Sequence, residues 1–391
     1  MTEDATRQST NLASLRREWG WVLAANLTLL AGAAWLMRGG WSDPGAWRAW
    51  LGVASAILAY QLFHLWRNLS QNFAGNGQAR LFPTLGLGNW ITLLRSALLA
   101  LLSGFLLTPR PEGWAAWAPG GLYLAAALMD YLDGWAARAT GRASRLGEIL
   151  DMHWDGYGVL VACILLVMYG QAPAWYVLVG LARYLFVAGL WLRERRGQPI
   201  YAMQPSMIRR ALAGAQMGFI AAILLPVFTP PTTLVAATIF MLPLLGSFLR
   251  DWLVVSGVVK IRDAQEGARP FWERWAAPAR AWLPLFLRGL AVALLLAAIW
   301  SEATHSRAWG LLLVGGCGLA LIGLGVAGRL AALAVMLMSG FVLRNDAQNL
   351  LYWAVLLAGT GVLLVGTGKY SLWKPEEWLI YHRPGEARQT R

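Results

Sequence analysis

Two pairs of aspartates interrupt stretches of sequence that are otherwise apolar. Asp130 and Asp133 stand near the end of one such stretch, and Asp151 and Asp155 stand near the beginning of the next. Spacings of three and four residues place the members of each pair on one face of a helix. Ionisable residues inside apolar helices are costly and usually functional. If the two helices are antiparallel neighbours, the four carboxylates meet at one point.

Four carboxylates at one point require a cation, because like charges repel and raise one another's pKa. Ligation by oxygen alone selects a hard ion, so we expect Mg²⁺ or Mn²⁺. The sequence has no nearby set of histidines and cysteines that would favour zinc. His153 is two residues from both Asp151 and Asp155, which puts it on another helix face. We therefore expect a carboxylate site without His153.

Glycine and arginine accompany the aspartates. Gly134 and Gly147 flank them. A glycine inside a helix costs roughly 1 kcal/mol relative to alanine, and close approach of a ligand is a good reason to accept that cost. Arg138 adds a fork-shaped donor that suits a diphosphate. Metal-binding carboxylates together with an arginine indicate phosphoryl transfer at the cytoplasmic membrane surface.

The composition is that of a membrane protein. Of the 391 residues, 58% are hydrophobic and 14% are charged, and the mean hydropathy is +0.49. Roughly 20 consecutive apolar residues span a bilayer as a helix, and such stretches recur along the chain. We predict an all-α, polytopic transmembrane helical bundle with about twelve spans. The predicted spans are 20–37, 48–66, 89–108, 115–137, 150–169, 173–192, 211–228, 233–257, 283–300, 308–327, 329–343 and 347–366.

Basic residues give the predicted orientation. The net charge of +13 is spread over short loops between apolar stretches, so we expect no nucleic-acid partner. Cytoplasmic loops carry the excess of lysine and arginine, which puts the N-terminus and the loop with Arg142 and Arg145 inside. The polar start of the chain predicts no cleaved signal peptide. Cys163 and Cys317 lie in apolar stretches without metal or redox spacing.

The spacing of the spans predicts three blocks and a linker. These are a two-span N-terminal extension at 1–80, a six-span core at 81–260, an interfacial linker at 261–282, and a four-span membrane domain with a tail at 283–391. The linker alternates basic residues with tryptophans, as a helix on a headgroup layer would. The N-terminal spans carry Asn26 and Gln61 as their main polar residues, and these indicate no chemistry.

The segment from Asp130 to Arg138, followed after eight residues by Gly147 and then by Asp151 and Asp155, resembles the signature of the CDP-alcohol phosphotransferase family. Every position of that signature is filled. The segment from Asn89 to Arg95 is similar to the one that opens the family's first helix. The resemblance implies a central six-helix core of this family at 81–260. It also implies an integral, multi-pass protein of a prokaryotic cell membrane, with its active site at the cytoplasmic face.

The resemblance implies roles for individual residues as well. Asp130, Asp133 and Asp151 would hold the metal on the donor's diphosphate, with two ions as the expected number. Asp155 would act as general base on the acceptor hydroxyl and would also contact the metal. The family contacts its CDP-linked donor at positions that correspond here to Asn89, Thr92, Gly134, Ala137, Arg138, Ser144 and Gly147. A homodimer is implied in the same way.

Three arginines are candidates for binding an acceptor phosphate. Arg183 lies in the middle of a predicted span, and its rival interpretation is an internal ion pair that fixes helix packing. Arg209 and Arg210 resemble a basic pair near the family's acceptor, but they stand where the family has Gly-Lys, so the identity of the acceptor stays open. For Arg250 and its neighbour Asp251 we expect a structural ion pair.

These observations predict a membrane phosphotransferase of phospholipid biosynthesis. A CDP-lipid similar to CDP-diacylglycerol would transfer a phosphatidyl-type group to the hydroxyl of a small polyol or polyol phosphate, such as glycerol phosphate or inositol phosphate, and CMP would leave. One alternative is transfer from a soluble CDP-alcohol to a lipid acceptor. A second, of another class, is a non-catalytic cation-binding transporter or scaffold. The intact signature favours the enzyme.

The C-terminal block carries a resemblance of its own. Its end, from Gly366 to Leu372, resembles the ending of the DoxX-like four-helix membrane family, although Trp373 stands where that family has an acidic residue. The block is expected to be a packing or oligomerisation partner, or to have a separate activity.

Overall fold

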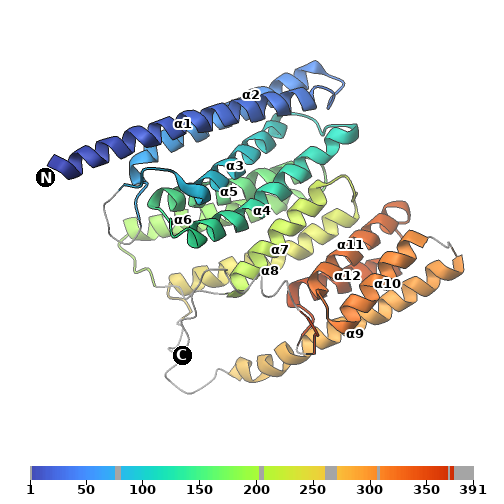
Figure 1. Ribbon diagram of the computed structural model, residues 1–391. Coiled ribbons are helices and arrows are strands. Elements are labelled where there is room, and N and C mark those ends of the chain that lie inside the picture. Colours follow the sequence, from blue (N-terminus) through green and yellow to red (C-terminus); the bar gives the residue numbers. More distant parts are fainter. Residues whose placement is uncertain are drawn as a thin grey trace. The chain divides into compact units, whose positions relative to one another are not determined.

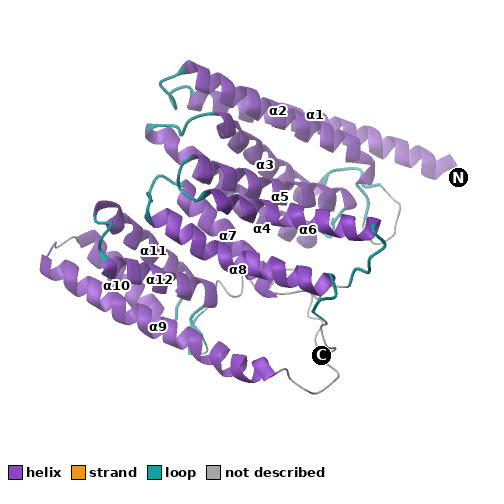
Figure 2. Cartoon of the chain, turned by 180° about the vertical axis from the view of Figure 1, so that it is seen from behind, coloured by secondary structure: helices purple, strands orange, loops and turns teal. Residues whose placement is uncertain are grey.

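Helices form nearly all of the regular structure. A computed structural model describes residues 2–74, 81–201, 207–259, 271–305, 309–368 and 370–373. These residues form no strand beyond three isolated β-bridges (Figure 2). The α-helices labelled in Figure 1 are α1 (Thr2–Met37), α2 (Pro44–Asn68), α3 (Gly86–Ser103), α4 (Ala118–Ala139), α5 (Arg145–Met168), α6 (Val177–Arg195), α7 (Met207–Leu224), α8 (Thr232–Val255), α9 (Phe271–His305), α10 (Trp309–Leu324), α11 (Gly328–Asn345) and α12 (Leu350–Val365). Each predicted span overlaps one of them, so the predicted all-α bundle is confirmed.

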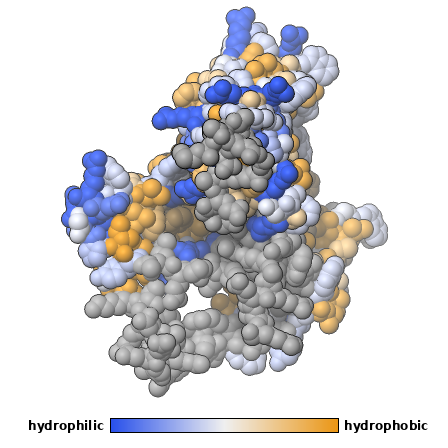
Figure 3. Space-filling model, turned by 60° about the vertical axis from the view of Figure 1, so that its left-hand side comes forward, coloured by the Kyte–Doolittle hydropathy of each residue, from blue (hydrophilic) through white to orange (hydrophobic). Residues whose placement is uncertain are grey.

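The helices are suited to a lipid environment. Seven helical segments of the described chain are long and apolar enough to cross a membrane, and three shorter helices are also apolar. Large apolar side chains face outward, among them Trp21 and Trp35 at 70% exposure and Trp300 at 75%. Figure 3 shows residues of high hydropathy in orange on the surface. Contiguous apolar surface of this kind is stable in lipid, which identifies a multi-pass membrane protein.

The described residues divide into two compact units. Those of Met1–Leu185 and Met217–Pro226 form the first unit, and those of Phe186–Gln216 and Val227–His382 form the second. The division passes through α6 and α7, so these helices contribute to both units. The domain boundaries predicted from the spacing of the spans stay a prediction.

Helix α3 is the centre of the first unit, where it packs against α2, α4 and α5. Small residues permit this packing. A Cβ atom added to Gly88 would lie 2.9 Å from the Cβ of Ala137 on α4, and one added to Gly158 on α5 would lie 2.9 Å from Leu99. Because α3 is buried on most sides, its polar side chains need partners inside the protein. These partners build the site described below.

The N-terminal helices are joined to α3 by a chain of buried hydrogen bonds. Asn26 on α1 donates to the side-chain oxygen of Gln61 on α2 at 2.9 Å. The amide nitrogen of Gln61 lies 2.7 Å from the carbonyl oxygen of Leu93 and 2.7 Å from the hydroxyl of Ser96, both on α3. Asn26 and Gln61 are 6% and 0% exposed. The two polar residues of the extension thus hold it against the central helix.

Four helices of the second unit, α9 to α12, pack on one another. A glycine permits close contact between α10 and α11, because a Cβ added to Gly318 would lie 2.4 Å from Val335. The hydroxyl of Tyr352 on α12 donates to Glu302 on α9 at 2.9 Å. Of the predicted linker at 261–282, residues 271–282 are the first part of α9, while 261–270 lie outside the described residues. The DoxX-like resemblance stays a prediction.

Candidate metal and phosphate site

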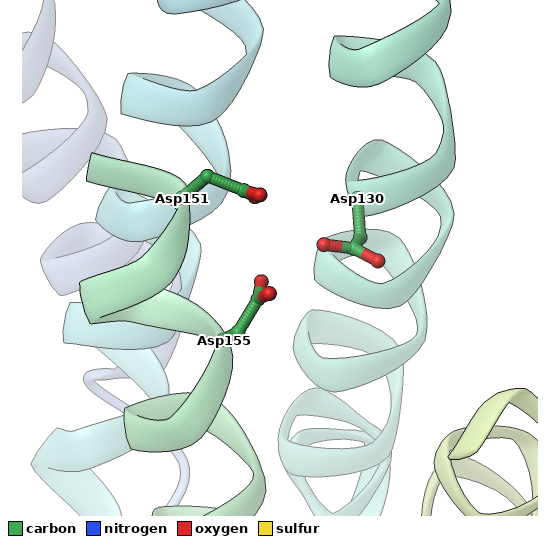
Figure 4. Close-up of side chains that lie close together, drawn as sticks. All are labelled: Asp130, Asp151 and Asp155. Carbon is green, nitrogen blue, oxygen red and sulfur yellow. The ribbon is translucent and has the colours of Figure 1, made fainter. Parts of the chain in front are cut away.

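The carboxylates of α4 and α5 lie together in the first unit. Asp130 and Asp133 come from α4, and Asp151 and Asp155 come from α5. Figure 4 shows Asp151 and Asp155, one turn apart, directed toward Asp130 on the other helix. One oxygen from each of these three residues lies within 4.8 Å of the other two. Residues 140–144 join the two helices, so α4 ends and α5 begins close to the site.

An arginine of α3 contacts all four carboxylates. Arg95 is 2% exposed, and its Nη1 contacts Asp130 directly and lies 3.3 Å from Asp133 Oδ2. Its Nη2 lies 3.0 Å from Asp151 Oδ1 and 2.9 Å from Asp155 Oδ1. In the sequence, Arg95 stands out only as the end of the family-like segment that begins at Asn89. The signal that could have found its role was a cation in the middle of a long apolar stretch, which must be paired internally.

Asp133 differs from the other three aspartates in its surroundings. It is 6% exposed, and its Oδ2 lies 3.0 Å from the hydroxyl of Thr92 on α3. The set of three close oxygens does not include it. Thr92, which the family resemblance assigns to the donor, therefore meets one of the predicted metal ligands. A hydrogen bond of this kind fixes the direction of the carboxylate.

Three further residues predicted to bind the donor meet where α3 passes the start of α5. The side-chain nitrogen of Asn89 lies 3.1 Å from the hydroxyl of Ser144 and 3.3 Å from the side-chain oxygen of Asn72. Ser144 is the N-cap of α5 and accepts from the backbone N–H of Gly147 at 3.1 Å. A Cβ at Gly147 would lie 2.6 Å from Asn89 Oδ1, so the absence of a side chain at Gly147 leaves room for the side chain of Asn89. Asn72, 0% exposed, is a member of this group that sequence reasoning missed.

The other predicted donor residues lie in the last two turns of α4. A Cβ at Gly134 would approach Arg138 Nη1 to 3.1 Å. Ala137 packs against Gly88 of α3, as described above. Helix packing therefore accounts for the small side chain of Ala137. The guanidinium of Arg138 lies beside Gly134, one helical turn earlier.

The predicted acceptor residues are distributed over both units. In the first unit, Arg183 Nη1 lies 3.7 Å from Asp155 Oδ2, and both side chains are about a third exposed, at 38% and 34%. In the second unit, Arg209 Nη1 lies 2.9 Å from Asp251 Oδ2. The side chain of Arg210 lies outside the described residues. The expected pairing of Asp251 with Arg250 is wrong, because Arg250 is exposed on α8 and Arg209 makes the contact.

The donor atoms of the cluster suit a hard divalent cation. Asp130, Asp151 and Asp155 offer oxygen alone, within the 4.8 Å stated above, which fits Mg²⁺ or Mn²⁺ better than a softer metal. His153 faces elsewhere, since its ring stacks on His64 of α2 at a centroid distance of 4.7 Å and its Nε2 lies 3.2 Å from the hydroxyl of Tyr60. The cluster can hold a divalent metal ion, while the identity and number of ions stay predictions.

Comparison with known proteins identifies the central block. The family model for CDP-alcohol phosphatidyltransferase matches residues 85–259, a range that contains the four aspartates, Arg95 and Arg183. Residues 85–259 belong to the CDP-alcohol phosphatidyltransferase family. The predicted resemblance is therefore confirmed for these residues.

Named relatives agree with the family. A CDP-diacylglycerol–glycerol-3-phosphate 3-phosphatidyltransferase of Bacillus subtilis is 34% identical over 116 residues, covering 27% of this chain and 60% of the relative. One with the same name from Cereibacter sphaeroides is 32% identical over 124 residues, covering 31% and 54%. A Mycobacterium tuberculosis protein provisionally named a cardiolipin synthase is 28% identical over 116 residues, covering 29% and 54%. The matches thus span little more than half of each relative. No solved structure gives a significant match.

Proposed function

We propose that this protein transfers a phosphatidyl-type group from a CDP-lipid to the hydroxyl of a small polyol or polyol phosphate and releases CMP. The observation that carries the proposal is the cluster of Asp130, Asp151 and Asp155, whose oxygens lie within 4.8 Å inside a domain of the phosphatidyltransferase family. The names of two relatives, with CDP-diacylglycerol as donor and glycerol 3-phosphate as acceptor, support this choice of substrates.

The proposed roles of the four carboxylates differ with their positions. Asp130, Asp133 and Asp151 would hold the divalent cation, which when bound would supply positive charge that neutralises the phosphate oxygens of the donor. Thr92 keeps Asp133 turned toward the cluster through its hydrogen bond of 3.0 Å. Arg95 holds all four carboxylates from the side of α3. Positioning of this kind is the main contribution that a protein makes to phosphoryl transfer.

Asp155 is the general base of the proposed reaction. The acceptor hydroxyl forms a bond to the β-phosphorus of the donor, the bond between this phosphorus and the oxygen of CMP breaks, and the hydroxyl proton passes to Asp155. Asp155 is the aspartate that Arg183 approaches, at 3.7 Å. Because Arg183 is 38% exposed, it can bind the phosphate of an incoming acceptor beside the base. The position of Arg183 beside Asp155 therefore favours a phosphorylated acceptor.

The natural setting of the reaction is the cytoplasmic face of a prokaryotic cell membrane. The basic loops between α4 and α5 and after α6 support this orientation, since cytoplasmic loops carry the excess of arginine and lysine. CDP-linked donors and polyol phosphates are polar at their reacting ends, so a site near a helix–loop–helix connection can receive them from water. A homodimer is part of the proposal through the family resemblance alone.

The test is metal-dependent release of CMP by purified protein in detergent. CDP-diacylglycerol and Mg²⁺ would be supplied with glycerol phosphate, inositol phosphate, inositol, serine or no acceptor. The wild type is expected to release CMP with at least one acceptor, and Asp155→Asn is expected to lower that rate by a factor of about 10²–10⁴, the usual contribution of a general base. The matched control is Asp346→Asn, at an exposed aspartate of the second unit, which should leave the rate unchanged.

The outcomes separate the interpretations. CMP release that requires both an acceptor and a metal, and that is lost in Asp155→Asn but kept in Asp346→Asn, supports the transferase function. The acceptor that permits this release is then identified. Folded wild-type protein that neither releases CMP nor binds labelled CDP-lipid in the presence of metal would refute the proposal and favour a cation-binding scaffold. If release occurs only when a soluble CDP-alcohol is given together with a lipid acceptor, donor and acceptor are reversed.

A further inference from the structure

A buried asparagine of the N-terminal extension contacts the group of residues predicted to bind the donor. Asn72 directly follows the short 3₁₀-helix Leu69–Gln71, precedes the residues that the family model matches, and is 0% exposed. Its backbone carbonyl oxygen accepts from the N–H of Phe82 at 2.8 Å, and its side-chain nitrogen donates to the carbonyl oxygen of Thr84 at 2.9 Å. Asn72 is therefore held by both its backbone and its side chain.

These contacts fix the orientation of two neighbouring side-chain amides. A backbone carbonyl oxygen can only accept a hydrogen bond, so Asn72 turns its nitrogen to Thr84 and leaves its oxygen to face Asn89. The same rule applies to Asn89, whose nitrogen lies 2.8 Å from the carbonyl oxygen of Leu85. This nitrogen also lies 3.3 Å from Asn72 Oδ1 and 3.1 Å from the hydroxyl of Ser144. Three oxygens thus surround the nitrogen of Asn89 and leave its carbonyl oxygen as the end that points away from them.

The carbonyl oxygen of Asn89 is an available acceptor at the start of α5. It accepts no hydrogen bond from the described residues, and it is not one of the fully buried side-chain atoms that lack a partner. The oxygen lies close to Gly147, where an added Cβ would be 2.6 Å from it. Gly147 stands four residues, about one helical turn, before Asp151 on the same face of α5. A ligand at the carboxylates can therefore also meet this oxygen.

The chemistry of this oxygen limits what it can bind. A carboxamide oxygen only accepts hydrogen bonds, and the ionised diphosphate of a CDP-linked donor offers only acceptor oxygens. The hydrogen-bond donors of such a molecule are the amino group of its base and the hydroxyl groups of its ribose. The oxygen of Asn89 therefore suits the nucleoside, while the carboxylates and their metal suit the diphosphate.

We propose that Asn72 is a positioning residue that directs the carbonyl oxygen of Asn89 toward the nucleoside of the CDP-linked donor. This inference rests on the proposed function and extends it, because it gives the N-terminal extension a part in donor binding. Without the Asn72 side chain, the nitrogen of Asn89 keeps two acceptors but loses the one that joins it to the extension. The amide then rotates more freely, and its oxygen faces the nucleoside for less of the time.

The experiment measures equilibrium binding of CMP, the proposed product, to purified protein in detergent with Mg²⁺, beside UMP, 2′-deoxy-CMP and 3′-deoxy-CMP. The wild type is expected to bind CMP more tightly than at least one analogue, and that analogue tells whether the amino group or a ribose hydroxyl meets Asn89. Asn72→Leu should weaken CMP binding about two- to tenfold, the effect of one neutral hydrogen bond, and should narrow the same preference. The control is Asn68→Leu, which should leave CMP binding unchanged, because the Asn68 side chain donates within its own helix, to the carbonyl oxygen of His64 at 2.8 Å.

Two further variants separate positioning from a general effect on the fold. If Asn72 acts through Asn89, Asn72→Leu should weaken CMP binding no further when Asn89→Leu is already present. Asn72→Asp should keep most of the CMP affinity, since a protonated carboxyl group can donate to Thr84 and accept from Asn89 as the amide does.

Each result has a definite meaning. A loss of affinity in Asn72→Leu that disappears in the Asn89→Leu background, with Asn68→Leu unchanged, supports the positioning role. Losses that add in the double variant overturn it and assign Asn72 to packing alone. Equal binding of CMP and all three analogues by the wild type also overturns it, and this result requires no variant to fold. A wild type that binds none of these nucleotides overturns it as well; if that protein also releases no CMP from CDP-diacylglycerol, the proposed function itself has failed.

Discussion

Removal of the Arg95 guanidinium tests the electrostatic basis of the site. In Arg95→Met an apolar side chain about as long as the aliphatic part of arginine replaces the charged one, so the change removes mainly the guanidinium and its charge. The four carboxylates of α4 and α5 then lose the cation that contacts each of them at 3.3 Å or less. Arg183 is a poor replacement, because it lies 3.7 Å from Asp155 and is 38% exposed. We expect the metal-free variant to be much less stable than the metal-free wild type.

The size of the stability loss in Arg95→Met follows from how deeply Arg95 and its partner carboxylates are buried. Removing one partner of a buried ionic group costs about 3–5 kcal/mol. Arg95 is 2% exposed, but Asp130, Asp155 and Asp151 are 33%, 34% and 47% exposed. Water therefore screens part of the repulsion, and the lower end, about 3 kcal/mol, applies. For a domain of 150–250 residues each kcal/mol shifts Tm by about 2–4 °C, so the expected fall is about 6–12 °C.

The assay is thermal unfolding in detergent, with EDTA and with saturating Mg²⁺ or Mn²⁺. We expect Arg95→Met to lose about 6–12 °C in EDTA and to recover most of it with metal, because a divalent cation supplies the missing positive charge. The control is Arg145→Met, which removes an exposed pair with Glu148, 51% and 56% exposed, and should change Tm by less than about 2 °C. A fall in Arg95→Met of the same size with and without metal would refute the argument that Arg95 and the cation balance the same charges.

Two further variants test how the first unit is held together. Gly88→Ala should lower the free energy of unfolding, measured by chemical denaturation, by about 1–3 kcal/mol, because the new Cβ would lie 2.9 Å from the Cβ of Ala137. The control is Gly121→Ala on α4, which should be neutral or slightly stabilising because nothing lies within 4 Å of its Cβ position. Gln61→Leu should cost about 1–3 kcal/mol in the same measurement, since it leaves buried Asn26 unpaired. The double variant with Asn26→Leu should recover part of that loss, and no recovery would contradict the assigned hydrogen bond.

The sequence predicted the helices well, because their signal is simple. Long apolar stretches that end at glycine, proline or charge must form helices in lipid, where every backbone hydrogen bond has to be made within the segment. The meeting of Asp130 with Asp151 and Asp155 was predictable for a related reason. A short connection makes α4 and α5 antiparallel neighbours, and spacings of three and four residues keep each pair on one face.

Contacts between distant segments were not predictable in this way. Arg95 lies 35 residues before Asp130 and 60 before Asp155, and helical periodicity gives no information on which helix covers which face. The same limit applies to Gln61. It looked like an isolated polar residue in a span without chemistry, yet it is 0% exposed and hydrogen-bonded to α3.

The N-terminal extension therefore acts on the site through α3. Gln61 contacts the backbone of Leu93 and the hydroxyl of Ser96, and these residues flank the turn that carries Arg95. Thr92, the neighbour of Leu93, contacts Asp133. A shift of α3 along its axis would move the guanidinium away from carboxylates that it meets at about 3 Å, and hydrogen bonds weaken steeply beyond that distance. Hydrogen bonds from the N-terminal extension thus help to hold α3, and with it Arg95, beside the four aspartates.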